Sequence, residues 1–241
     1  MNLLAQAVNV FAVPWALFRY IGEHPGWSWI VPALAAFAAV VVRGLSSAPL
    51  DAAQAQVEMQ RVLATMPEDT ARQAASMMGI VSPEAIAVQF IAGSIISLLI
   101  AWVACSALLH LLSLTMGNHR PYRALFEATV WAWVPFILRD LVQAAYIFFN
   151  GSLISYPGLS AFVAQGTSRS ANASNLLFVA ASHLDVFLLW NVVLLALAVA
   201  GVAGFGKIRS AILPILYWVL VILLAWVWGT LQNALGAGMV G

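Results

Sequence analysis

Long apolar stretches dominate this sequence and constrain its fold more than any other feature. They have 18 to 29 residues each, and a helix of about 20 residues is enough to cross a bilayer. The five stretches are residues 28–45, 86–114, 124–149, 184–205 and 211–235. Only 8% of all residues are charged, against about 25% in a soluble domain, so a water-exposed globule is excluded. Helices satisfy their own backbone groups in lipid, and we therefore predict an all-α integral membrane protein with five transmembrane helices.

The segment before the first span, residues 1–26, has a different character. Pro14 interrupts it, and the aromatic residues Trp15 and Tyr20 suit the headgroup level of a membrane. Polar residues recur there at helical spacing, namely Asn2, Gln6 and Asn9. We predict an interfacial amphipathic helix, with a sixth span as the alternative, followed by a five-span membrane domain over residues 27–241.

The short loops predict how the chain is oriented. Arg120 and Arg123 lie between the second and third spans, Lys207 and Arg209 lie between the fourth and fifth, and neither loop holds an acidic residue. Basic short loops face the cytoplasm, so the N-terminus is expected inside and the C-terminus outside. Nine of the ten basic residues are Arg, which is typical of GC-rich bacteria, so we expect a bacterial inner membrane.

The outer loop between the first two spans, residues 46–84, is predicted to be helical. Residues 51–66 repeat apolar and polar side chains at helical spacing, and a second short helix is expected over 67–78. Ser82 then reads as a helix N-cap with Pro83 in the first helical position. A helix that begins there and ends near Leu114 extends beyond the outer leaflet.

Ionisable residues at membrane depth are the candidate functional residues, because placing a charge there costs at least about 2.5–3.5 kcal/mol. Arg139 and Asp140 are adjacent in the third span, where Arg139 shares a helix face with Gln143, and His183 and Asp185 open the fourth span. These five residues form a candidate polar site for a partner, a ligand or a lipid headgroup near the outer leaflet. The alternatives are a purely structural role and a proton or ion relay.

Two further groups of residues are predicted to work through helix contacts. His110, Arg123 and Glu127 lie near the cytoplasmic ends of their spans and form a candidate cluster there. A row of small residues on the fourth span suits close helix packing, either within one protomer or in a homo-oligomer. This row consists of Ala196, Ala200 and Gly204.

Motifs for catalysis and for cofactors are missing from the sequence. It contains no Gly-rich phosphate loop, no His-Glu-x-x-His and no Gly-x-Ser-x-Gly. His183 and Asp185 offer two metal ligands without a third, and Cys105 is the single cysteine, so neither a metal site nor a disulfide is expected. The net charge of +1 gives no case for a nucleic-acid partner. We therefore expect no enzyme and no cofactor.

Two blocks of the sequence resemble the Yip domain family of five-span membrane proteins. In the first, WVACSALLHLLSLTMGNHRPYRALFEATVWAWVPFIL, the similarity rests on Trp102, His110-Leu111, Gly117 and Pro135. In the second, which begins SHLDVFLLW, it rests on Leu184, Asp185, Phe187 and Trp190. The entry segment is also similar, through Pro14, Phe18-Arg19 and Pro25.

This resemblance implies a non-enzymatic integral membrane protein. Bacterial relatives are associated with ABC exporters of the macrolide-export type, where they look like accessory subunits, and eukaryotic relatives act in vesicle budding. The first hypothesis is thus an adaptor or scaffold that holds a partner membrane complex or organises lipid. The alternative is a small transporter or channel with a polar path near Arg139, Asp140 and Asp185, and an intramembrane enzyme is a third, weaker possibility.

Overall fold

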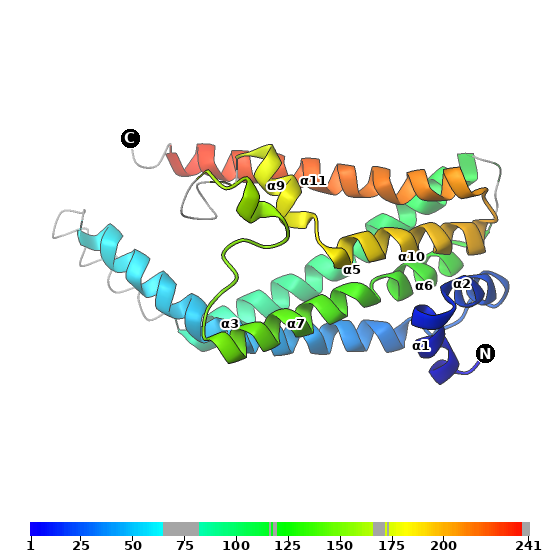
Figure 1. Ribbon diagram of the computed structural model, residues 1–241, viewed down its shortest axis with the longest axis horizontal. Helices are drawn as coiled ribbons and strands as arrows, with labels where there is room; N and C mark the ends of the chain where they lie inside the picture. The colour runs from blue at the N-terminus through cyan, green and yellow to red at the C-terminus, as the bar shows by residue number, and fades with distance from the viewer. Residues whose placement is uncertain (65–81, 116, 118–119, 166–171, 173, 238–241) are drawn as a thin grey trace. The chain divides into compact units, whose positions relative to one another are not determined.

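The computed structural model describes residues 1–64, 82–115, 117, 120–165, 172 and 174–237, and these contain helices and no strand. Five of the described helical segments are long and apolar enough to cross a membrane. They are Ile30–Arg61, Pro83–Thr115, Tyr122–Asn150, Val186–Ala203 and Lys207–Ala234. The predicted all-α fold with five spans and a helical N-terminal segment is therefore confirmed (Figure 1).

The first span belongs to a longer helix than the sequence predicted. Helix α3 (Ile30–Ala64) has 35 residues and does not end near residue 45. The first part of the expected loop helix, up to residue 64, is a continuation of the same helix, with Pro49 inside it. The later residues of this helix are more polar than the earlier ones, which is why the sequence suggested a loop there. The helix predicted over 67–78 lies outside the described residues.

The second span starts as predicted. Helix α5 (Pro83–Thr115) has Pro83 as its first residue, and the Ser82 hydroxyl accepts a hydrogen bond from the Ala85 N–H at 3.2 Å. The Ser82 cap is thereby confirmed. At 33 residues, α5 is about 50 Å long, which exceeds the roughly 30 Å hydrocarbon core.

The third span is broken into α6 (Tyr122–Ala132) and α7 (Val134–Asn150), where the sequence predicted one continuous helix. Pro135 explains the break, since proline has no N–H to donate and its ring crowds the carbonyl four residues earlier. The chain makes a tight turn instead: the Trp133 N–H bonds to the Val130 carbonyl at 3.2 Å, and the Phe136 N–H bonds to the Trp133 carbonyl at 2.9 Å.

The C-terminal part of the chain supplies the last two spans. The short helix α9 (Leu176–His183) precedes α10 (Val186–Ala203), and a turn leads from there into α11 (Lys207–Ala237). Gly204 ends α10 with φ +70°, a left-handed conformation that glycine adopts without strain.

The N-terminal segment forms two short helices, α1 (Leu3–Ala12) and α2 (Pro14–Glu23), rather than one. The Asn2 side chain caps α1 by accepting from the Ala5 N–H at 2.8 Å. Pro14 starts α2, because the first helical position is where a missing N–H costs nothing.

The described chain folds into two compact units. Unit 1 comprises residues 1–34, 101–136 and 155–241, and unit 2 comprises residues 35–100 and 137–154. Large side chains fill the core of unit 1, including Trp102, Trp131, Phe18, Leu125 and Leu195. The buried apolar residues of unit 2 are mostly alanines: Ala36, Ala39, Val40, Ala48, Ala52, Ala87, Ala144 and Ile147. Its helices can therefore approach one another closely.

Candidate functional site

Glu127, on α6 in unit 1, binds the segment that joins α2 to α3. Its side chain is 2% exposed. One carboxylate oxygen accepts from the Gly26 N–H at 2.5 Å, and the other accepts from the Ser28 hydroxyl. That hydroxyl in turn accepts from the Trp131 indole N–H at 3.0 Å. Hydrogen bonds to a carboxylate are stronger than neutral ones, so this buried charge fixes the connecting segment.

Arg123 holds the same segment from one helical turn earlier. Its Nε donates to the Gly26 carbonyl at 3.2 Å, and its guanidinium lies over the Trp27 ring, 4.8 Å from the ring centre. Of the predicted cytoplasmic-side cluster, the structure thus brings Arg123 and Glu127 together on Gly26. The His110 ring instead meets Tyr122 edge-on, with ring centres 5.8 Å apart.

Asn191 ties three helical segments of unit 1 together at membrane depth. It is completely buried on α10. Its amide N–H donates to the Ala132 carbonyl at 2.8 Å, at the break between α6 and α7. Its carbonyl accepts from the Trp218 indole N–H of α11 at 2.9 Å. The Phe136 N–H, which would reach Ala132 in an unbroken helix, bonds to Trp133, so Asn191 replaces the lost bond.

Aromatic rings surround this arrangement, which we call the Asn191 junction (Ala132, Trp133, Phe136, Asn191 and Trp218). The Phe136 and Trp218 rings meet edge-on at 5.6 Å, and the Trp133 and Trp218 rings stack at 6.3 Å between centres. Rings at such separations attract each other beyond their burial alone, and they also keep water away from the Asn191 amide.

In unit 2, Asp140 pairs with a residue that the sequence analysis missed. The Arg43 guanidinium on α3 donates to the Asp140 carboxylate at 2.8 Å, and it also lies 5.3 Å from the centre of the Phe90 ring on α5. The side chain of Asp140 is 11% exposed and that of Arg43 31% exposed. The pair therefore joins α3 to α7 while leaving one edge of the guanidinium accessible.

The remaining residues of the predicted outer-leaflet site have structural contacts of their own. Arg139 and Gln143 are half-buried on α7 in unit 2. In unit 1, Asp185 caps α10 by accepting from the Leu188 N–H at 2.7 Å, and His183 Nδ1 lies 2.8 Å from the Val179 carbonyl oxygen. Because these residues are divided between two units, their joint site stays a prediction.

The close helix contact in unit 1 is made by glycines other than the one predicted. A Cβ on Gly201 of α10 would lie 3.0 Å from the backbone nitrogen of Arg19, and a Cβ on Gly22 of α2 would lie 3.0 Å from the Val202 Cα. Ala196 and Ala200 are half-buried, whereas Gly204 ends the helix with open space around its Cβ position. A role for the Ala196, Ala200 and Gly204 row between protomers stays a prediction.

One missed residue carried a signal in the sequence. Asn191 is the one amide in the apolar run of α10, and such a residue at membrane depth usually has a bonding partner. Arg43 sat near the expected end of a span, where an arginine needs no ion-pair partner because it can extend to the headgroups. The contact between Gly22 and Gly201 could not be predicted, because it depends on which faces of α2 and α10 meet.

In the described part of the chain, five helical segments are able to span a membrane, the third is broken beside Pro135, and buried polar side chains join them. These features define a polytopic α-helical membrane protein. The family model of the Yip1 domain matches residues 8–229, nearly the whole chain, and the protein belongs to this family. The resemblance found in the sequence is therefore confirmed. Comparison with curated proteins and with solved structures gave no match.

Proposed function

We propose that this Yip1-domain protein is a non-enzymatic membrane scaffold, an adaptor or accessory subunit that holds another membrane protein. One observation carries the proposal: three buried polar side chains of the spans bond to the chain itself. Glu127 binds Gly26 and Ser28, Asn191 binds Ala132 and Trp218, and Asp140 binds Arg43. Groups engaged in this way hold helices together and are not poised to transform a substrate.

The outward surfaces of two spans support the same proposal. In α5 and in α11, only 22% of the most apolar window is buried. On α5, Gly93 has no atom within 4 Å of its Cβ position, and Ser97 lies exposed one turn further along. Small residues let helices approach closely in lipid, so this face of α5 is the first surface to test for a protein partner.

Photo-crosslinking in native membranes tests the proposal. A photoreactive residue replaces Ile100, which is 63% exposed on the Gly93 side of α5, and a matched one replaces Leu224, which is 59% exposed on α11. We expect one of the two positions to give an adduct with a single membrane protein, and the resemblance to exporter-associated relatives makes an ABC exporter the first candidate. Adducts with lipid alone at both positions would contradict a scaffold role.

The transporter alternative makes a separate prediction. If Asp140 and Asp185 serve structure, through the Arg43 pair and the cap of α10, proteoliposomes should show no ion flux above protein-free vesicles. Flux that the Arg139→Ala variant abolishes would favour a polar path instead. An unaltered helical circular dichroism spectrum of that variant would show that the loss is not due to unfolding.

A further inference from the structure

The outward face of α1 is apolar, whereas its inward face carries an amide. Leu4, Val8 and Phe11 are 75%, 55% and 51% exposed, but Gln6 is buried. This pattern is the reverse of a helix on a water-soluble protein, where the polar face points outward. No charged side chain occurs before Arg19. The outward face of α1 therefore suits lipid and not water.

The α1–α2 pair is attached beside the membrane-spanning part of unit 1. The Phe11 ring meets the Trp190 ring edge-on at 5.6 Å, and Trp190 lies about 20 Å along α10 from Gly204, at 1.5 Å per residue. Figure 1 shows α2 nearly end-on and α10 in the plane of view, so α2 runs across the span. The crossing point is the Gly22 and Gly201 contact. Helix α1 thus lies level with α10 instead of beyond its end.

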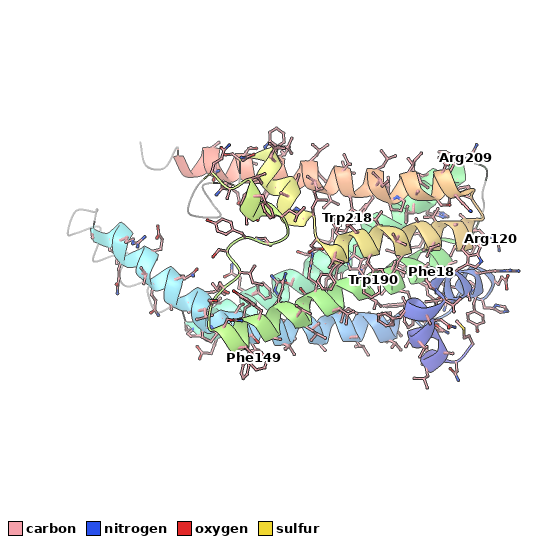
Figure 2. All side chains as sticks on the ribbon, viewed as in Figure 1. Phe18, Arg120, Phe149, Trp190, Arg209 and Trp218 are labelled. Atoms are coloured by element: carbon pink, nitrogen blue, oxygen red, sulfur yellow. The ribbon has the colours of Figure 1, made fainter. Side chains whose placement is uncertain are left out.

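Exposed basic side chains surround the same end of unit 1. Arg120 reaches α2 through a 3.5 Å hydrogen bond to the Gly22 carbonyl, and Figure 2 shows Arg120 and Arg209 at this end. Of the acidic groups here, Glu23 is paired with Arg19 at 3.2 Å, and Glu127 is buried. We call the exposed basic residues other than the paired Arg19 the basic rim: Arg120, Arg123, Lys207 and Arg209.

We propose that α1, α2 and the basic rim form a binding surface for an anionic lipid leaflet. The exposed apolar side chains of α1 insert among the acyl chains, and the basic rim binds phosphate groups at the surface above them. An uncharged apolar face beside a basic rim complements anionic phospholipid in both respects. Because the Phe11–Trp190 contact holds α1 level with the span α10, the exposed apolar face of α1 lies at the depth of acyl chains, which makes the bilayer its occupant and not a second protein.

Spin labels test the depth of α1. In a Cys105→Ser chain reconstituted in nanodiscs, one label is placed at Val8→Cys and a matched label at Glu23→Cys, which is exposed on α2. We expect oxygen, which partitions into lipid, to relax the Val8 label, and a water-soluble nickel complex to relax the Glu23 label. Strong relaxation of the Val8 label by nickel would overturn the proposal, and so would shielding from both reagents, which would indicate a covering protein.

The preference for anionic lipid has its own readout. Native mass spectrometry compares phosphatidylglycerol and phosphatidylcholine retained by the wild-type chain and by Lys207→Gln/Arg209→Gln, a change at two exposed residues away from the Glu127 contacts. We expect the wild type to retain more phosphatidylglycerol, and the preference to fall by up to about fivefold for each charge removed. Equal retention of both lipids by the wild type would overturn the basic-rim half of the proposal.

Discussion

Single polar side chains decide how the spans of this protein are held. In lipid there is no hydrophobic force between helices, so packing and hydrogen bonds must join them. Asn191 satisfies both the Ala132 carbonyl, which is freed at the helix break beside Pro135, and the Trp218 indole N–H. Glu127 and Asp140 likewise join separate segments, through Gly26 and Arg43 respectively. These three residues should therefore be the most sensitive polar positions of the spans.

Replacing Asn191 tests this directly. Asn191→Leu leaves the Ala132 carbonyl and the Trp218 N–H buried without partners, so we expect the free energy of unfolding to fall by about 1–3 kcal/mol. Trp218→Phe removes one of the two bonds and should cost less. Unfolding in mixed micelles with increasing sodium dodecyl sulfate, followed by circular dichroism, measures both variants. Wild-type stability of Asn191→Leu would contradict the structural role of the junction.

The Arg43–Asp140 pair predicts an energetic coupling. Each of Arg43→Met and Asp140→Leu leaves one partly buried charge in the spans without its partner, and we expect each to destabilise the fold by about 1–3 kcal/mol. The double variant leaves neither charge, so its loss should be smaller than the sum by about 1 kcal/mol or more. The same micelle titration gives the four values of the cycle. Strict additivity would show that the pair contributes no net energy.

At the scale of helices, close packing rests on residues that look unremarkable in the sequence. Gly22→Ala and Gly201→Ala place a Cβ against backbone atoms 3.0 Å away, and backbone cannot move aside as a flexible side chain can. We expect each change to loosen α2 from α10 at a cost of about 1–3 kcal/mol, despite the better helix propensity of alanine. Hydrogen exchange of residues 14–23 should rise accordingly.

Gly93→Ala is the matched control for that experiment. It makes the same chemical change within a helix, but its Cβ meets no atom within 4 Å. Hydrogen exchange in α2 should stay at the wild-type rate in this variant. Similar behaviour of all three variants would mean that the close approach of α2 and α10 does not matter for stability.

The elements were predictable from sequence to the extent that hydropathy reports them. The five spans and the Ser82 cap follow from residue type alone. The continuation of α3 past residue 45 was hidden, because a helix leaving the membrane changes its polarity and not its backbone. To predict the break at Trp133, one must know which group bonds a single carbonyl near Pro135. To predict the partners of Asp140 and Glu127, one must know how each helix is rotated about its axis. The local sequence contains neither piece of information.

For the whole molecule, orientation is the property to measure next. The basic turns predict that Arg120→Cys and Lys207→Cys, in a Cys105→Ser chain, react with a membrane-impermeant maleimide from the cytoplasmic side. Asn150→Cys, at the exposed end of α7, should react from the opposite side. Labelling of right-side-out and inverted vesicles separates the two outcomes. The reverse pattern at all three positions would place the N-terminus outside.

The 35 residues of α3 have a consequence for any molecule that approaches the protein from the side of the membrane on which α3 ends. A helix of about 52 Å is longer than the roughly 30 Å hydrocarbon core of a bilayer, so part of α3 extends beyond that core. A molecule that lies on the bilayer surface would contact α3 near the membrane, whereas one that extends away from the surface would contact its end. We therefore expect the length of α3 to limit how closely a flat molecule can approach the membrane surface beside this protein.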